Sequence, residues 1–91
     1  MPCQVEVGGK ADAQLAGLDA AMGASVERKI LWLAENAAGM VHRRLVGLPE
    51  DLAGLCKLRV GDYRILYWVY PAKKLVRIYR LQHRSEVYRR L

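Results

Sequence analysis

The sequence predicts an α+β domain in which a short N-terminal strand and a helical hairpin precede a three-stranded antiparallel meander. Apolar residues recur at helical spacing between residues 12 and 37, and they alternate with polar ones after residue 56. Glycine- and proline-containing breaks separate these segments. The 91 residues, of which 53% are hydrophobic, suffice for one packed core, so residues 1–91 are expected to form a single domain.

The N-terminal half is predicted to hold the strand and both helices. Cys3 to Val7 alternates apolar and polar side chains, which is typical of a short strand at a sheet edge. Asp12 is the expected N-cap of the first helix and Gly23 its expected end. A second N-cap is expected at Ser25, and the apolar stripe of its helix comprises Val26, Ile30, Leu33 and Ala37.

The C-terminal half is predicted to form the meander, with the helices covering one face of the sheet. Its strands are expected over residues 56–60, 62–70 and 75–81, with turns at Gly61-Asp62 and at residues 71–74. The segment before them is broken by glycine and proline, and its leucines are expected to pack under the sheet: Leu45, Leu48, Leu52 and Leu55.

Positive charge is concentrated in the last third of the chain. Residues 1–56 carry five Lys and Arg against seven Asp and Glu, a net charge of −2. Residues 57–91 carry ten against two, a net charge of +8. Such a concentration suits a polyanion such as nucleic acid, although basic residues can also simply solubilise a small sheet.

Strand alternation predicts where this charge lies. Lys57 and Arg59 share one face of their strand, and Arg64 shares a face with Leu66 and Trp68 on the next. The opposite sides, rich in aliphatic and aromatic residues, are the expected core. The face away from the helices is therefore expected to gather Lys57, Arg59 and Arg64. The last strand leaves open whether Arg77 or Arg80 approaches this cluster.

The tail adds His83, Arg84 and Tyr88, which are candidates for RNA chemistry. Cleavage of RNA requires removal of a proton from the 2′-hydroxyl, cations to stabilise the phosphate, and a donor for the leaving oxygen. Two of them could also have no role in catalysis: His83 could be an ordinary surface residue, and Tyr88 could pack the tail onto the domain. Paired carboxylates, a phosphate-binding glycine loop and close His/Cys spacing are missing from the sequence, so no metal or other cofactor is expected.

The remaining features favour a cytoplasmic protein. The sequence contains no run of eighteen apolar residues, so no membrane span is expected. The first ten residues do not resemble a secretion signal. Cys3 and Cys56 are expected to stay reduced.

Two motifs resemble the RelE/ParE superfamily of toxins from type II toxin–antitoxin systems. Lys57 to Tyr67, preceded by Gly54-Leu55, is similar to the superfamily pattern, and His83 to Arg89 is similar to the C-terminal signature of its RelE branch. The resemblance implies a ribosome-dependent endoribonuclease that cuts messenger RNA by 2′-oxygen attack and leaves a cyclic phosphate. It also implies an acidic, RelB-like antitoxin as partner in a hetero-oligomer.

The resemblance further implies roles for single residues. Lys57 would accept a proton or stabilise charge, Arg64 would hold the scissile phosphate, and Tyr88 would stack on or activate the nucleotide. The general acid is left open between Arg84 and His83. The residues expected to bind RNA are Arg59, Arg77, Arg80 and His83.

Two features of the sequence depart from the best-studied RelE pattern. Leu55 stands where that pattern has a lysine, and only His83-Arg84 precede Ser85 where that pattern has a longer basic tail. The alternative function is inhibition of DNA gyrase without RNA cleavage, as in the ParE branch.

Overall fold

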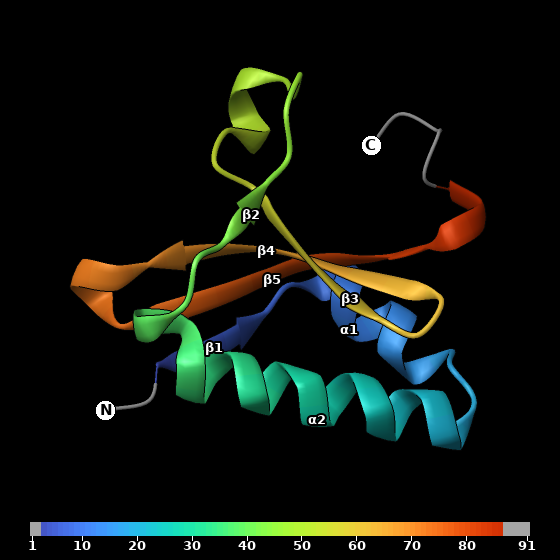
Figure 1. Ribbon diagram of the computed structural model, residues 1–91. Coiled ribbons are helices and arrows are strands. Elements are labelled where there is room, and N and C mark those ends of the chain that lie inside the picture. Colours follow the sequence, from blue (N-terminus) through green and yellow to red (C-terminus); the bar gives the residue numbers. More distant parts are fainter. Residues whose placement is uncertain (1–2, 87–91) are drawn as a thin grey trace.

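Residues 3–86, the part of the chain that the computed structural model describes, form two α-helices on one face of a five-stranded sheet (Figure 1). The α+β class is the one predicted. In the sheet the strands follow the order β1-β5-β4-β3-β2. Their bounds are β1 Gln4–Val7, β2 Arg43–Arg44, β3 Cys56–Val60, β4 Tyr63–Tyr70 and β5 Leu75–His83. The helices are α1 Gly9–Ala16 and α2 Ala20–Asn36, and short 3-10 turns lie at η1 Ala37–Gly39, η2 Glu50–Leu52, η3 Pro71–Lys73 and η4 Arg84–Glu86.

The predicted meander is present and is extended by a strand on each side. β3, β4 and β5 are consecutive antiparallel neighbours, and Gly61 adopts a positive φ of 57° in the two-residue turn between Val60 and Tyr63. β1 lies at one edge, as predicted, and pairs in parallel with β5. The fifth strand, β2, pairs with β3 and was not predicted, because it has only two residues and no alternation to recognise.

The predicted boundary between the helices is wrong. Asp19, not Ser25, caps α2, since its carboxylate accepts a hydrogen bond of 2.9 Å from the backbone N–H of Met22. Gly23 lies inside α2, where its N–H donates to Asp19 O at 2.8 Å. Gly8 precedes α1, so Asp12 sits within that helix instead of capping it. The prediction failed because α2 tolerates Gly23 in its first turns and because its true cap, Asp19, lies six residues before Ser25.

The core lies between the helices and the sheet face that they cover. Val26, Ile30 and Leu33 of α2 belong to one buried cluster with the β4 residues Ile65 and Tyr67. Leu58, Val60, Tyr63 and Val69 pack against this cluster, which is the predicted inward side of β3 and β4. Cys56 is also buried there, and both cysteines are free thiols, as expected. Burial raises the pKa of the Cys56 thiol, while nearby Arg44 has a smaller, opposing effect.

The opposite face, which was expected to be open, is covered in part by the segment whose leucines were expected to pack under the sheet. The chain between β2 and β3 rises from the sheet on the side away from the helices (Figure 1). Trp68 Nε1 donates a 3.1 Å hydrogen bond to Ala53 O and so ties this excursion to β4. Leu52, Leu55 and Leu66 are buried outside the main core cluster, whereas Leu45 and Leu48 are only half-buried. The face predicted to be open therefore has a buried apolar centre.

Within the described residues, neither helix has the length and apolar character to cross a membrane.

Candidate nucleic-acid interface

Five cations occupy neighbouring positions on the sheet face away from the helices. In one row across the strands, Arg43 is opposite Lys57, Lys57 is opposite Leu66, and Leu66 is opposite Arg80. In the next row Arg59 is opposite Arg64. Residues directly opposite each other share a face of a sheet, so these rows bring together what we call the cationic face: Arg43, Lys57, Arg59, Arg64 and Arg80.

A β-bulge in β5 decides the position of Arg80. The register between β4 and β5 shifts at Leu66/Tyr67, so that Tyr67 pairs with Ile78 and Leu66 pairs with Arg80. Ile78 and Leu81 both point into the core, which leaves Tyr79 and Arg80 together on the other side. The choice between Arg77 and Arg80 was left open by the sequence; strict alternation from Ile78 would turn Arg80 inward, and the extra residue of the bulge brings it to the cationic face instead.

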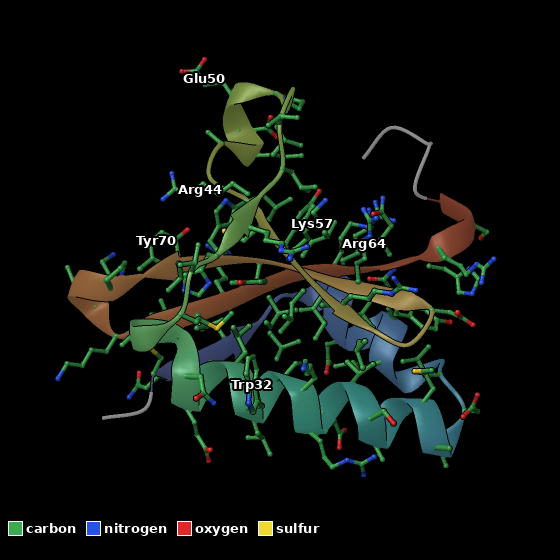
Figure 2. The ribbon with its side chains drawn as sticks, viewed as in Figure 1. Trp32, Arg44, Glu50, Lys57, Arg64 and Tyr70 are labelled. Atoms are coloured by element: carbon green, nitrogen blue, oxygen red, sulfur yellow. The ribbon has the colours of Figure 1, made fainter. Side chains whose placement is uncertain are left out.

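The cationic face borders a hollow of about 390 Å³. We call it the cationic hollow, and its lining residues are Met40, Val41, Arg43, Lys57, Leu58, Arg59 and Arg64. Figure 2 shows Lys57 and Arg64 on the same side of the sheet, opposite the helix that carries Trp32. The expected juxtaposition of Lys57, Arg59 and Arg64 is therefore present.

Counter-charges are scarce at this hollow. In the part of the chain that is described, no carboxylate lies within 4.0 Å of the side-chain nitrogens of Arg43, Lys57 or Arg64. Arg59 Nε instead donates to Gly61 O at 3.4 Å. Like charges on adjacent strands oppose one another, so an anion entering the hollow would relieve their repulsion.

Arg43 was missed by the sequence analysis and is held in place by its neighbour His42. The His42 Nε2 atom lies 2.8 Å from Ala37 O, which can only accept, so Nε2 carries the hydrogen. Nδ1 therefore accepts from the Tyr67 hydroxyl at 2.7 Å. Because Tyr67 is fully buried in β4, this bond fixes the segment entering β2 against the core. The only sequence signal was the adjacent pair Arg43-Arg44, and nothing in it indicated a strand.

Other predicted RNA-binding residues lie away from the cationic hollow. Arg77 shares the face but is opposite Trp68, and its Nε lies 3.9 Å from a Glu6 carboxylate oxygen. His83 is on β5, not in the tail, and contacts the Tyr63 ring edge-on, with centroids 5.0 Å apart. Since Tyr63 packs on the core, His83 is on the helix side of the sheet.

The two tail candidates for catalysis have different outcomes. Arg84 is beside the β3–β4 turn, where its Nη1 lies 3.6 Å from Asp62 Oδ1 and its backbone N–H donates to Asp62 O. This places Arg84 next to the turn that follows Arg59. Tyr88 falls outside the described residues. Among residues 3–86, no three His, Cys, Asp or Glu side chains gather as metal ligands.

Comparison with known proteins identifies the family. The model for the ParE toxin of the type II toxin–antitoxin system parDE matches residues 5–88. The chain belongs to this toxin family. It is thus a toxin of the RelE/ParE superfamily, as the two motifs indicated. The comparison with curated proteins gives no match.

Solved structures of RelE toxins are similar to this toxin. The toxin–antitoxin complex RelBE2 from Mycobacterium tuberculosis aligns at 28% identity and a TM-score of 0.76, covering 93% of this chain and 94% of that one. The RelE–RelB complex from Pyrococcus horikoshii aligns at 20% identity and a TM-score of 0.72, covering 96% and 100%. The isolated RelE toxin of E. coli aligns at 21% identity and a TM-score of 0.70, covering 94% and 90%. The last two likenesses concern the fold alone.

Proposed function

We propose that this toxin is a metal-independent endoribonuclease that cuts messenger RNA on the ribosome. The observation that carries the proposal is the convergence of Arg43, Lys57 and Arg64 on one hollow without a carboxylate within 4.0 Å among the described residues. Such a site suits a reaction in which negative charge builds up on a phosphate. The similarity to RelE structures supports the same function.

The proposed reaction is an attack of the ribose 2′-oxygen on the adjacent phosphorus. The new O–P bond closes a 2′,3′-cyclic phosphate, the bond from phosphorus to the 5′-oxygen breaks, and one proton moves from the 2′-hydroxyl to the departing oxygen. Lys57 accepts that proton or stabilises the phosphate, and Arg64 holds the phosphate oxygens. Arg43 and Arg80 add positive charge from the neighbouring strands. Arg84 is the proposed donor of a proton to the departing 5′-oxygen. Tyr88 is the proposed contact to the nucleotide.

The proposed partner is an acidic antitoxin of the RelB kind. Two of the similar structures are complexes of a RelE toxin with RelB, which supports an antitoxin for this family member. The net charge of +6 suits an acidic partner, because opposite potentials speed encounter and favour correct pairing.

The test compares single substitutions in a ribosome-based cleavage assay. Arg64→Ala is expected to lower the cleavage rate of ribosome-bound messenger RNA by about 10²–10³-fold, as for other residues that stabilise a developing anion. Arg43→Gln should lower it in the same direction. The readout is primer extension across a defined message, with the fold of each variant checked by circular dichroism.

Arg44→Gln is the matched control for Arg43→Gln. Arg44 is opposite Cys56, whose side chain is in the core, and it points away from Lys57 and Arg64 (Figure 2). Its loss should therefore leave cleavage unchanged. Full cleavage by folded Arg64→Ala, or equal loss in both β2 variants, would rule out catalysis by the cationic face.

Inhibition of DNA gyrase is a second candidate, favoured by the match to the ParE family model. It predicts that the purified toxin blocks gyrase-dependent DNA supercoiling while messenger RNA on ribosomes stays intact. The same two assays therefore separate the candidates.

A further inference from the structure

A second hollow lies on the same sheet face, beyond the excursion between β2 and β3. Its volume is about 560 Å³, within the range of small-ligand sites. We call it the aromatic hollow, because Trp68, Tyr70 and Tyr79 line it. These are three of the seven aromatic residues in the chain. The other lining residues are Gly8, Gly9, Lys10, Asp51, Leu52, Ala53, Arg77 and Ile78.

The faces of the Trp68 and Tyr79 rings are available for a ligand to stack on. Trp68 has a single donor, Nε1–H, and it is already bonded to Ala53 O. The Trp68 and Tyr79 rings are 5.3 Å apart at an interplanar angle of 58°, so they form a corner and do not cover each other by stacking. An aromatic ligand can lie against one wall of this corner.

Two cations line the hollow and a third lies beside it, although Arg77 Nε also lies 3.9 Å from a Glu6 carboxylate oxygen. Lys10 and Arg77 line it, and Lys73 Nζ lies 5.9 Å from the centre of the Tyr70 ring. Asp51 is the one acidic residue in the lining that is described, so the described lining has a net positive charge. An aromatic floor with a basic rim is the arrangement that proteins use to hold single-stranded nucleic acid, by stacking a base and attracting its phosphate.

The aromatic hollow lies on the same side of β4 as the cationic face, and the excursion between β2 and β3 separates the two. Arg64, Leu66, Trp68 and Tyr70 alternate on the same side of this strand, and Figure 2 shows Tyr70, Lys57 and Arg64 all on the side away from the helices. The four steps along β4 from Arg64 to Trp68 span about 13 Å at the usual rise of a strand. By length alone, a single strand of a few nucleotides can span this distance around the excursion.

We infer that the aromatic hollow is a base-binding subsite, in which an unpaired RNA base stacks on Trp68, Tyr70 or Tyr79 while another phosphate of the same strand lies in the cationic hollow. The inference deepens the proposed function and rests on it for the identity of the ligand. Trp68 offers a base no free donor, because its Nε1–H is bonded to Ala53 O, so stacking on its face carries little preference among bases.

The test uses the fluorescence of Trp68 in the full-length chain. Trp32 and Trp68 are the two tryptophans, and Trp32 lies on the far helix layer, so Trp32→Phe leaves Trp68 as the reporter. The probe is a 2′-O-methyl uridine hexanucleotide, which has no 2′-hydroxyl to attack and therefore cannot be cut. Stacking should quench the fluorescence, whereas an abasic hexanucleotide with the same backbone should not. Quenching by neither hexanucleotide, or equal quenching by both, would overturn the inference.

The second measurement is the affinity for the hexanucleotide after the tyrosines that line the aromatic hollow are substituted. Tyr70→Leu combined with Tyr79→Leu should raise the Kd of the hexanucleotide by about five- to hundredfold, the loss expected for one stacked base. It should also raise KM for ribosome-bound messenger RNA more than it lowers kcat. Tyr70→Phe keeps the ring and should bind as the parent does. An unchanged Kd and KM in the Leu pair would overturn the inference.

The two proposals can fail separately. If the toxin cuts no messenger RNA but the hexanucleotide still quenches Trp68 in a ring-dependent way, the nuclease proposal falls and the subsite stands. If cleavage proceeds with no quenching and no effect of the Leu pair, the subsite falls and the nuclease stands. Quenching by the antitoxin alone, and not by the hexanucleotide, would assign the aromatic hollow to the antitoxin and overturn the base-binding inference.

Discussion

At the scale of single residues, the position of Arg43 depends on a hydrogen bond that leads into the core. His42 joins the carbonyl of Ala37 to the hydroxyl of Tyr67, and Arg43 follows it directly in β2. Burial of Tyr67 raises the pKa of its hydroxyl above the ordinary value of 10.0, with a smaller contribution from Cys56 in the same direction. Tyr67 therefore remains a neutral donor to His42 when exposed tyrosines begin to ionise.

This raised pKa predicts a loss of stability in alkali. Above about pH 10 the unfolded chain releases the Tyr67 proton and the folded chain keeps it, so the folded state binds more protons and its stability falls as pH rises. One such group contributes up to about 1.4 kcal/mol per pH unit. Urea unfolding between pH 9 and 11 should show a shallower decline for Tyr67→Phe than for the parent. Parallel pH profiles would contradict this account of Tyr67.

At the scale of elements, the residue pattern correctly predicted which segments are helices and strands, whereas several of their ends lie elsewhere in the structure. The stripe of Val26, Ile30 and Leu33 correctly predicted the buried side of α2, because it depends only on helical periodicity. The start of α2 depends on which polar side chain reaches a free N–H, and both Asp19 and Ser25 are acceptable caps by residue type. β5 likewise extends to His83, since pairing with Tyr63 of β4 continues past the bulge.

Removal of the cap provides a test of the α2 boundary. Asp19→Ala should lower the free energy of unfolding by about 1 kcal/mol, the usual cost of losing an N-cap. Ser25→Ala, at the position first expected to cap this helix, should cost only a few tenths of a kcal/mol at most, because Ser25 lies inside α2, where alanine has the higher helix propensity. Chemical denaturation of the two variants in parallel checks the difference. A larger loss for Ser25→Ala would place the cap at the residue where it was first expected.

At the scale of the whole molecule, the sheet separates two kinds of surface. The helices and the main core occupy one face, whereas the cationic face and the aromatic hollow occupy the other, divided by the excursion that Trp68 ties down. The excursion that the Trp68 hydrogen bond holds against β4 also buries apolar residues between the two hollows. The two hollows are therefore distinct sites on one surface. RNA bound across them would contact cations from four strands.

The salt dependence of RNA binding tests this picture of the surface. Five phosphate contacts would give a slope of about −3.5 for log K against log salt with single-stranded RNA, at about −0.7 per contact. Arg59→Gln should make the slope shallower by about 0.7. Fluorescence titrations of the uncleavable hexanucleotide at several salt concentrations measure both slopes.

Lys29→Gln is the matched control for this measurement. Lys29 is on α2, with its Nζ 4.4 Å from the centre of the Trp32 ring, on the opposite side of the molecule from the cationic face. Its removal changes the net charge by the same amount and should leave the slope unaltered. If Lys29→Gln and Arg59→Gln had equal effects, the binding would reflect net charge and not this face.

The sequence by itself determined the α+β class, the toxin family and the face that Lys57, Arg59 and Arg64 share, because periodicity and local motifs depend only on neighbouring residues. Tertiary structure decided the rest of the site. Arg43 enters through a two-residue strand that exists only by pairing with β3, and Arg80 enters through a bulge that depends on the register with β4. The aromatic hollow joins residues from α1, β4, β5 and the η2 excursion. Such long-range pairings leave no periodic signal in the chain, since their energy comes from partners far away in sequence.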